Sequence, residues 1–179
     1  MSKLLSVCLC LILLFGCSGN REEANLIPAR ATRVFSGQSV EVVLAEGSGI
    51  TKVRIIGIDA PDLRQSPWGE AAKKRLSELV IGLPIDLETD SLKSDRFNRI
   101  QAHIWRDKVL ISQQLVKEGF VLANTEYPHS YSKLLIDARE YARLMGLGIW
   151  NPKLALRQTP SQFRARIKNN HQSRSITNN

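Results

Sequence analysis

Short stretches in which apolar and polar residues alternate dominate the middle of this chain and restrict the folds that it can adopt. The alternating segments are residues 39–45, 85–89 and 100–104, and residues 52–58 are rich in β-branched residues that favour a further strand. A period of two residues turns one face of a strand toward a core and leaves the other face polar. In a chain of 179 residues, closing such short strands into a barrel leaves no unpaired sheet edge. We therefore expect a mainly β, five-stranded OB-like barrel, with another α+β sandwich as the alternative.

About three helices accompany the predicted strands, so the expected class is α+β. Apolar residues recur every three to four positions in Pro67–Val80 and Ser130–Met145, which is the helical period. A shorter helix is expected over Ser112–Glu118. Gly119 and Gly146 follow the last two of these helices and are typical of helix ends.

The N-terminal segment has the pattern of a targeting sequence. A short apolar run follows Lys3 and is below the roughly 18–20 residues that span a bilayer, so it fits a secretory signal. Leu14-Phe15-Gly16-Cys17 resembles a bacterial lipobox, whose cysteine is lipidated. We expect residues 1–16 to be a signal peptide, Cys17 to carry a lipid anchor, and residues 17–30 to form a polar tether. The expected location is the cell envelope; an ordinary cleaved signal would instead give a secreted protein.

The positive charge of the chain is concentrated at its C-terminal end. The formal net charge is +8, and the residues after Asn151 include six Lys or Arg and no acid. Residues 153–179 therefore form a predicted disordered basic tail that adds non-specific affinity for polyanions. The preceding part is nearly balanced, so the high net charge does not by itself predict a basic binding face on the folded domain.

Several common catalytic motifs are missing from the sequence. It contains no glycine-rich phosphate loop, no G-x-S-x-G elbow and no H-E-x-x-H motif. All three cysteines lie within the first 17 residues, so the rest of the chain cannot form a disulfide or a cysteine metal site.

One ten-residue segment connects the predicted barrel to a known family. The run from Val53 to Asp62, VRIIGIDAPD, resembles the strand-and-loop signature of the staphylococcal nuclease (thermonuclease) family. Further resemblances follow in the family's order at residues 67–72, 94–99, 115–120 and 139–150. The resemblance covers residues 31–152 and implies an OB barrel capped by helices.

The resemblance also implies the roles of individual residues. Arg54 and Arg99 match the two arginines that bind phosphate, Asp59 matches a calcium ligand, and Asp62 stands at the water-activating position. Tyr127 matches a nucleotide-contacting tyrosine. The chemistry suits these residue types, because planar guanidinium groups can stabilise the charge that builds on phosphorus as a phosphodiester breaks.

Two departures from the family pattern weaken the predicted Ca²⁺ site. The family's D-G-D-T motif is here Ser36-Gly37-Gln38-Ser39, so Gln38 would be a neutral calcium ligand in place of a carboxylate. Asp62 replaces a glutamate and is shorter by one methylene, which moves its carboxylate by roughly 1 Å. We therefore expect weakened calcium dependence.

Together these features predict a monomeric, lipid-anchored or secreted nuclease that hydrolyses phosphodiester bonds in DNA or RNA. Two other readings stay open. The domain could be a catalytically impaired OB module that binds nucleic acid or nucleotides without cleaving them. It could also be a structural envelope lipoprotein whose basic tail binds an anionic surface.

Overall fold

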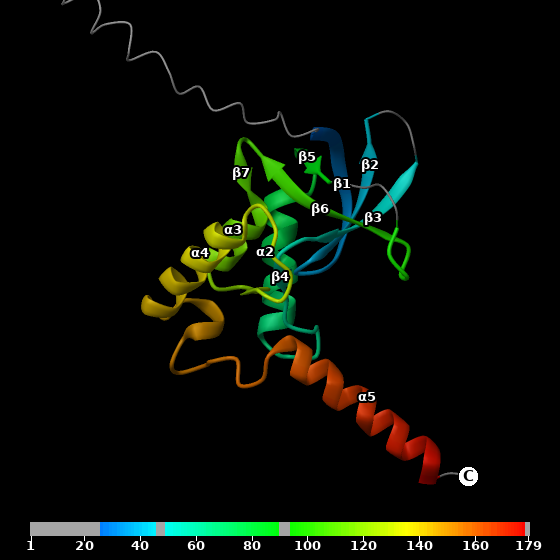
Figure 1. Cartoon of the computed structure of the whole chain (residues 1–179), viewed down its shortest axis with the longest axis vertical. Helices are drawn as coiled ribbons and strands as arrows, with labels where there is room; N and C mark the ends of the chain where they lie inside the picture. Colours follow the sequence, from blue (N-terminus) through cyan, green and yellow to red (C-terminus); the bar gives the residue numbers. More distant parts are fainter. Residues whose placement is uncertain (1–25, 46–48, 90–93, 178–179) are drawn as a thin grey trace, which may run out of the picture.

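Five strands form the body of the domain. The computed structural model describes residues 26–45, 49–89 and 94–177, with side chains described through residue 170. The barrel strands are β1 (Leu26–Ser36), β2 (Ser39–Leu44), β3 (Ile50–Ile55), β5 (Pro84–Glu88) and β6 (Arg99–Arg106). They are hydrogen-bonded in the order β3-β2-β1-β5-β6, and a parallel pairing of β3 with β6 closes the sheet on itself (Figure 1). The predicted five-stranded OB-type barrel is confirmed.

The strand β1 does not stand out in the sequence. It begins at Leu26, inside the segment predicted to be a polar tether and before the expected domain start at residue 31. Its pairing with β2 changes register between Ala31 and Arg33 and again between Val34 and Ser36. These irregularities interrupt the alternation of buried and exposed residues, which is the signal that reveals the other strands.

The three predicted helices are present, with small differences at their ends. They are α2 (Trp68–Val80), α3 (Ile111–Lys117) and α4 (Ser132–Leu144). The shorter elements are β4 (Ile58–Asp59), β7 (Val109–Leu110), β8 (Leu122–Ala123) and the 3-10 helix η1 (Gly148–Trp150). The pair β4–β8 lies outside the barrel sheet and joins Asp59 to Leu122.

The core fills the barrel and the space beneath α2. Val53 and Ile55 of β3 and Ala102 and Ile104 of β6 are fully buried, as their alternation predicts. The turn between β1 and β2 packs tightly on α2, because a Cβ atom at Gly37 would lie 2.6 Å from the Cβ atom of Ala72 in that helix. Only glycine fits at this point of the turn.

The C-terminal segment differs from the sequence prediction. Residues 160–177, predicted to be disordered, form helix α5 (Pro160–Thr177), which projects away from the domain (Figure 1). Its start is attached to the domain, since Phe163 is only 9% exposed and the Gln158 carbonyl accepts a hydrogen bond from Gln65 Nε2 at 2.9 Å. Trp68 Nε1 donates to the Leu154 carbonyl at 2.9 Å. Because one aromatic side chain and a few backbone hydrogen bonds attach this helix, its basic sequence lacks the repeated apolar positions that would predict a packed helix.

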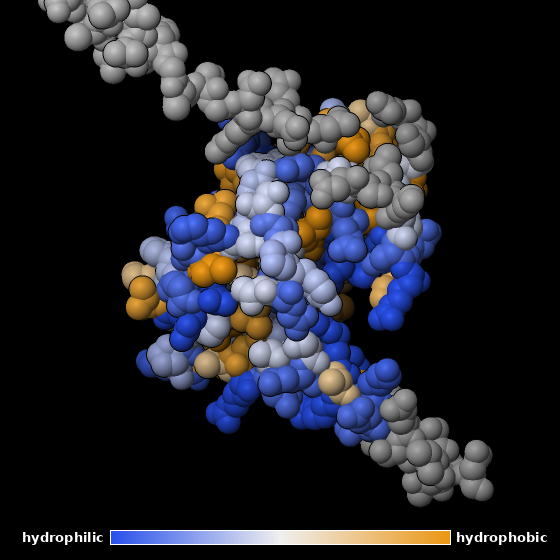
Figure 2. Space-filling model, viewed as in Figure 1, coloured by the Kyte–Doolittle hydropathy of each residue, from blue (hydrophilic) through white to orange (hydrophobic). Residues whose placement is uncertain are grey.

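The predicted signal peptide and Cys17 lie outside the described residues. Among the helices of residues 26–45, 49–89 and 94–177, none has the length and apolar character needed to cross a membrane. Strongly hydrophilic residues gather where α5 leaves the domain (Figure 2).

Candidate active site

Two neighbouring strands bring the two predicted phosphate arginines together. In the parallel pairing of β3 and β6, Lys52 lies opposite Arg99 and Arg54 lies opposite Gln101. Val53 of β3 and its partner Ile100 of β6 are buried in the core. Arg54 and Arg99 are their neighbours along the strands and therefore lie on the opposite, outer face. One strand pairing thus brings together two arginines that are 45 positions apart in the sequence.

Arg99 is held in place from its own loop. Its Nη2 and Nε atoms donate to Asp95 Oδ2 at 2.8 and 3.1 Å. Its Nη1 atom lies 3.5 Å from Ser39 Oγ, and its guanidinium lies 5.0 Å from the centre of the Phe97 ring. The hydrogen bond from Arg99 holds the pKa of Asp95 below its ordinary value. Arg99 is therefore oriented before any substrate arrives.

Arg54 has fewer hydrogen-bond partners than Arg99. It is half-buried, and within the described part of the chain no hydrogen bond to its guanidinium is found. Burial lowers the pKa of Arg54 and the nearby Arg99 and Arg164 lower it further, whereas Asp59 acts in the opposite direction. A half-buried cation beside two other cations favours the binding of an anion.

Asp62 lies in the loop that precedes α2. Its carboxylate accepts hydrogen bonds from Arg64 Nε at 2.8 Å and Arg64 Nη2 at 3.0 Å. These bonds hold the pKa of Asp62 below its ordinary value of 3.8, so the side chain stays ionised. The loop packs closely on the helix, because a Cβ atom at Gly69 would collide with the Asp62 carbonyl oxygen.

Asp59 has an arginine as its partner. Both of its carboxylate oxygens accept hydrogen bonds from Arg164 Nη2, at 2.7 and 2.9 Å. The two residues are 105 positions apart in the sequence and come from β4 and α5. Asp59 is the more protected partner, with 14% of its side chain exposed against 41% for Arg164. The residue that the resemblance assigns to calcium is thus bonded to a cation of the chain itself.

Gln38 is also engaged by the protein. Its side-chain oxygen Oε1, the side-chain atom of Gln38 that could bind calcium, accepts a hydrogen bond from the Ala60 backbone N–H at 2.7 Å, which engages one of its two lone pairs. Calcium takes about six to eight oxygen ligands. Within the residues that the structure describes, no group of three or more His, Cys, Asp or Glu side chains is arranged to hold a metal ion. The donor set around Asp59 and Gln38 therefore fits calcium poorly.

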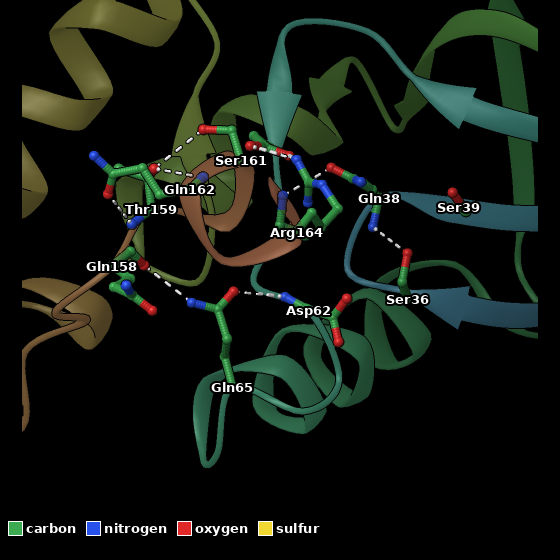
Figure 3. Close-up of polar contacts among 12 residues, drawn as sticks. Ser36, Gln38, Ser39, Asp62, Gln65, Gln158, Thr159, Ser161, Gln162 and Arg164 are labelled. Atoms are coloured by element: carbon green, nitrogen blue, oxygen red, sulfur yellow. Dashed lines mark hydrogen bonds and ion pairs between the residues drawn. The ribbon is translucent and has the colours of Figure 1, made fainter. Parts of the chain in front are cut away.

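Two adjacent pockets meet at Arg164. One has a volume of about 420 Å³ and is lined by Gln38, Asp62 and Arg99 among others. The other, of about 330 Å³, is lined by Arg54 and Asp59 together with residues of the loop after β8. Arg164 lines both pockets and projects from α5 toward the pocket that contains Gln38 (Figure 3).

The structure does not bring every predicted residue to these pockets. Tyr127 is 75% exposed and is not among the described residues that line them, so its contact with a nucleotide stays a prediction. The sequence reasoning missed Asp95, whose four-residue spacing from Arg99 is visible in the sequence, and Phe97, which is 59% exposed beside Arg99. It also missed Arg164, for which no local signal exists.

The chain is similar to proteins of one known family. Residues 52–152 match the family model described as "Staphylococcal nuclease homologue". The chain belongs to the staphylococcal nuclease family. It is 31% identical to a Haemophilus influenzae protein named "Uncharacterized endonuclease", over 79% of this chain and 75% of that protein. It is 26% identical to the "Thermonuclease" of Staphylococcus hyicus, over 75% of this chain and 82% of that one. It is also 27% identical to "Endonuclease YncB" of Bacillus subtilis, over 76% of this chain and 67% of that protein.

Arg164 lies outside the part of the chain that matches the staphylococcal nuclease model. That match ends at residue 152, before α5 begins at Pro160. The arginine pair, Asp59 and Asp62 lie within it. Proteins of this family generally use Ca²⁺. The contact between Asp59 and Arg164 therefore joins a family position to a segment that the family model does not describe.

Proposed function

We propose that this chain is a nuclease that hydrolyses phosphodiester bonds in DNA or RNA. The observation that carries the proposal is the convergence of Arg54 and Arg99 on one barrel face, beside pockets that also contain Asp62. The endonuclease and thermonuclease names of three relatives support the same reaction class.

The arginines and Asp62 have different roles in this reaction. Attack of water on phosphorus builds negative charge on the equatorial oxygens, and guanidinium groups stabilise that charge through bidentate hydrogen bonds. The ionised Asp62 carboxylate accepts a hydrogen bond from the attacking water and orients it. Its lowered pKa makes it a weak proton acceptor, so we assign it orientation more than proton removal.

Calcium dependence is weaker in this proposal than is general for the family. Gln38 brings no charge, and its side-chain oxygen already accepts a hydrogen bond from the Ala60 N–H. Asp59 is bonded to Arg164. Because calcium affinity follows the number of charged ligands, both features lower it.

We place the protein at the cell envelope. The apolar run that ends in Leu14-Phe15-Gly16-Cys17 supports a lipid anchor on Cys17, and an ordinary cleaved signal would give a secreted enzyme.

A nucleic-acid-binding module without catalysis is the second candidate. The hydrogen bonds that occupy Gln38 and Asp59 favour it, since they withdraw the family's metal ligands while both phosphate arginines remain. Arginines alone can hold a nucleotide phosphate.

A cleavage assay separates the two candidates. The purified full chain, solubilised in detergent, is incubated with single-stranded DNA, double-stranded DNA and RNA, each with Ca²⁺ and with a chelator. We expect slow cleavage in which Arg99→Ala costs about 10²-fold or more in rate. Arg143→Ala is the matched control, because Arg143 bonds to Glu140 on the exposed surface of α4. Binding without cleavage under every condition would support the binding module instead.

A further inference from the structure

Only one nitrogen of the Arg164 guanidinium is used by Asp59. Nη2 donates to both carboxylate oxygens, at 2.7 and 2.9 Å. Among the described residues, no hydrogen bond from Nε or Nη1 is found, and 41% of the side chain is exposed. Asp59 thus fixes one edge of the guanidinium and leaves its other N–H groups free to donate to a ligand.

The position of Arg164 is central to the site. It is the arginine common to the pocket that contains Arg99 and the pocket that contains Arg54. A nucleic-acid backbone with phosphates in both pockets would therefore lie beside Arg164.

Packing and hydrogen bonds at the start of α5 hold Arg164 in this position. Phe163, the preceding residue, is buried between the cations of Arg64 and Arg166, which lie 5.6 and 5.2 Å from its ring centre. Thr159 caps the helix: its Oγ1 accepts from the Gln162 N–H at 3.3 Å, and its own N–H donates to Gln162 Oε1 at 3.1 Å (Figure 3). This reciprocal pair satisfies two backbone groups at the helix start.

We propose that Arg164 is a third phosphate-binding arginine, supplied by the C-terminal helix, which provides the positive charge at Asp59 and binds the substrate backbone without a metal ion. The inference rests on the proposed function, because it assigns a ligand to the same site. It adds a residue outside the region that matches the family model.

The charges of the site are consistent with this role. Arg54, Arg99 and Arg164 face Asp59 and Asp95, while Asp62 is paired with Arg64. The cluster therefore keeps one unbalanced positive charge, which a single phosphodiester group neutralises. A substrate phosphate would relieve the mutual repulsion of the three arginines.

The test measures binding in the absence of metal and of turnover. The probe is a short fluorescein-labelled, phosphorothioate-protected single-stranded DNA, titrated with the full chain in excess chelator and followed by fluorescence anisotropy. We expect Arg164→Ala to weaken binding about tenfold, the scale of a lost charge-assisted hydrogen bond. Arg164→Lys should recover part of the loss. Lys168→Ala removes one positive charge from an exposed position of the same helix, and should change binding less than about twofold.

A double-mutant cycle separates phosphate binding from a structural role. If Arg164 only neutralises Asp59, Asp59→Asn should remove the need for it, and Asp59→Asn/Arg164→Ala should bind as well as Asp59→Asn alone. If Arg164 binds phosphate, the double mutant should bind about tenfold more weakly than Asp59→Asn. Thermal melting of each variant identifies loss of folding, and Arg164→Gln replaces Arg164→Ala if the alanine variant is unfolded.

The failure of this inference can be told apart from failure of the proposed function. Normal binding by Arg164→Ala and Arg164→Gln, or equal binding by Asp59→Asn and its double mutant, overturns the role of Arg164. In that case, loss of cleavage in Arg54→Ala and Arg99→Ala leaves the nuclease function intact. If the unmodified chain cleaves no substrate under any condition, the proposed function is wrong, and if those two variants cleave like the unmodified chain, the activity does not come from this site.

Discussion

At the scale of single residues, two changes around Asp59 are consistent with each other. Gln38 lacks the charge of the family's aspartate, and Arg164 supplies a positive charge to the remaining carboxylate. An ionised aspartate that is partly buried requires a cation or several hydrogen-bond donors. When the metal ligands decrease in number, a guanidinium can meet that requirement.

Calcium binding should strengthen most when both changes are reversed. Gln38→Asp adds a ligand charge and Arg164→Ala releases Asp59, so we expect the double mutant to gain more calcium affinity than the sum of the two single mutants. The measurement is the calcium-induced rise in melting temperature of the full chain. Gln38→Asn combined with Arg164→Ala is the control of similar size without the charge. A double mutant that responds to calcium no more than the unmodified chain contradicts this account.

Arg64 should set the pH at which Asp62 is protonated. The hydrogen bonds from Arg64 hold the pKa of Asp62 below 3.8, so the carboxylate remains ionised to lower pH than a free aspartate. Arg64→Ala should raise that pKa and move the acid limb of the cleavage rate to higher pH. A pH–rate profile of the two chains tests this, with Arg143→Ala as control. An unchanged acid limb would show that the protonation of Asp62 does not limit the cleavage rate.

His129 should make the domain less stable in mild acid. Burial lowers the pKa of His129 below 6.5, and its Nδ1 atom accepts a hydrogen bond from the Tyr131 N–H at 3.2 Å, which requires the neutral ring. The unfolded chain therefore binds a proton more readily, and stability falls as pH decreases below about 6.5. His129→Asn keeps an acceptor but cannot titrate, so its free energy of unfolding should depend less on pH over this range. Denaturant unfolding at several pH values measures the difference. If the free energy of unfolding of both chains depends on pH in the same way, His129 is not the cause of the acid sensitivity.

At the scale of elements, one carboxylate joins α2 to the end of α3. Glu118 accepts hydrogen bonds from Arg75 Nε at 2.6 Å, from Arg75 Nη2 at 2.7 Å and from Gln114 Nε2 at 2.6 Å. Burial alone would raise the pKa of Glu118, but the hydrogen bonds from Arg75 and Gln114 outweigh it and lower the pKa. The contact connects two helices that pack against different parts of the barrel.

Removing this contact should destabilise the domain. Glu118→Ala leaves a half-buried arginine without its bidentate partner, and we expect a loss of about 1–3 kcal/mol in the free energy of unfolding. Glu140→Ala is the matched control, because Glu140 also pairs with arginines, Arg139 and Arg143, but is 43% exposed, so its loss should cost about 0–1 kcal/mol. Urea unfolding measures both. Equal losses in the two variants would show that the helix contact has no special importance.

At the scale of the whole molecule, the beginning of the described chain and the candidate site lie at opposite ends of β1. The strand has eleven residues, which corresponds to roughly 30 Å, and it runs from Leu26 to Ser36 beside Gln38 (Figure 1). An anchor at Cys17 would therefore attach to the end of the barrel away from the arginines. Substrate could then reach the site from the side opposite the membrane.

The anchor itself is tested by the mature N-terminus. We expect mass spectrometry to find a lipid-modified Cys17 as the first residue, and the protein to fractionate with membranes. Cys17→Ser should abolish the modification and release or mislocalise the protein, whereas Ser18→Ala should have no effect. An unmodified mature N-terminus at any other residue would refute the anchor and leave ordinary secretion.

The parts of the molecule that depend on local pattern can be predicted from the sequence. Strands β2, β3, β5 and β6 and helices α2, α3 and α4 follow from periods of two and of 3.6 residues. The family motif within residues 53–62, together with the match at 94–99, identified Arg54, Asp59, Asp62 and Arg99 as candidates. These signals are local because each depends on neighbouring residues alone.

The tertiary structure alone decided which of these residues meet, and what holds them. The parallel pairing of β3 with β6 places Arg99 beside Arg54, and no short pattern specifies a pairing over that distance. The strand β1 was hidden by its register shifts, and α5 by its basic composition. The bond between Arg164 and Asp59 depends on the docking of Phe163, a contact between distant segments that exists only once the barrel has formed.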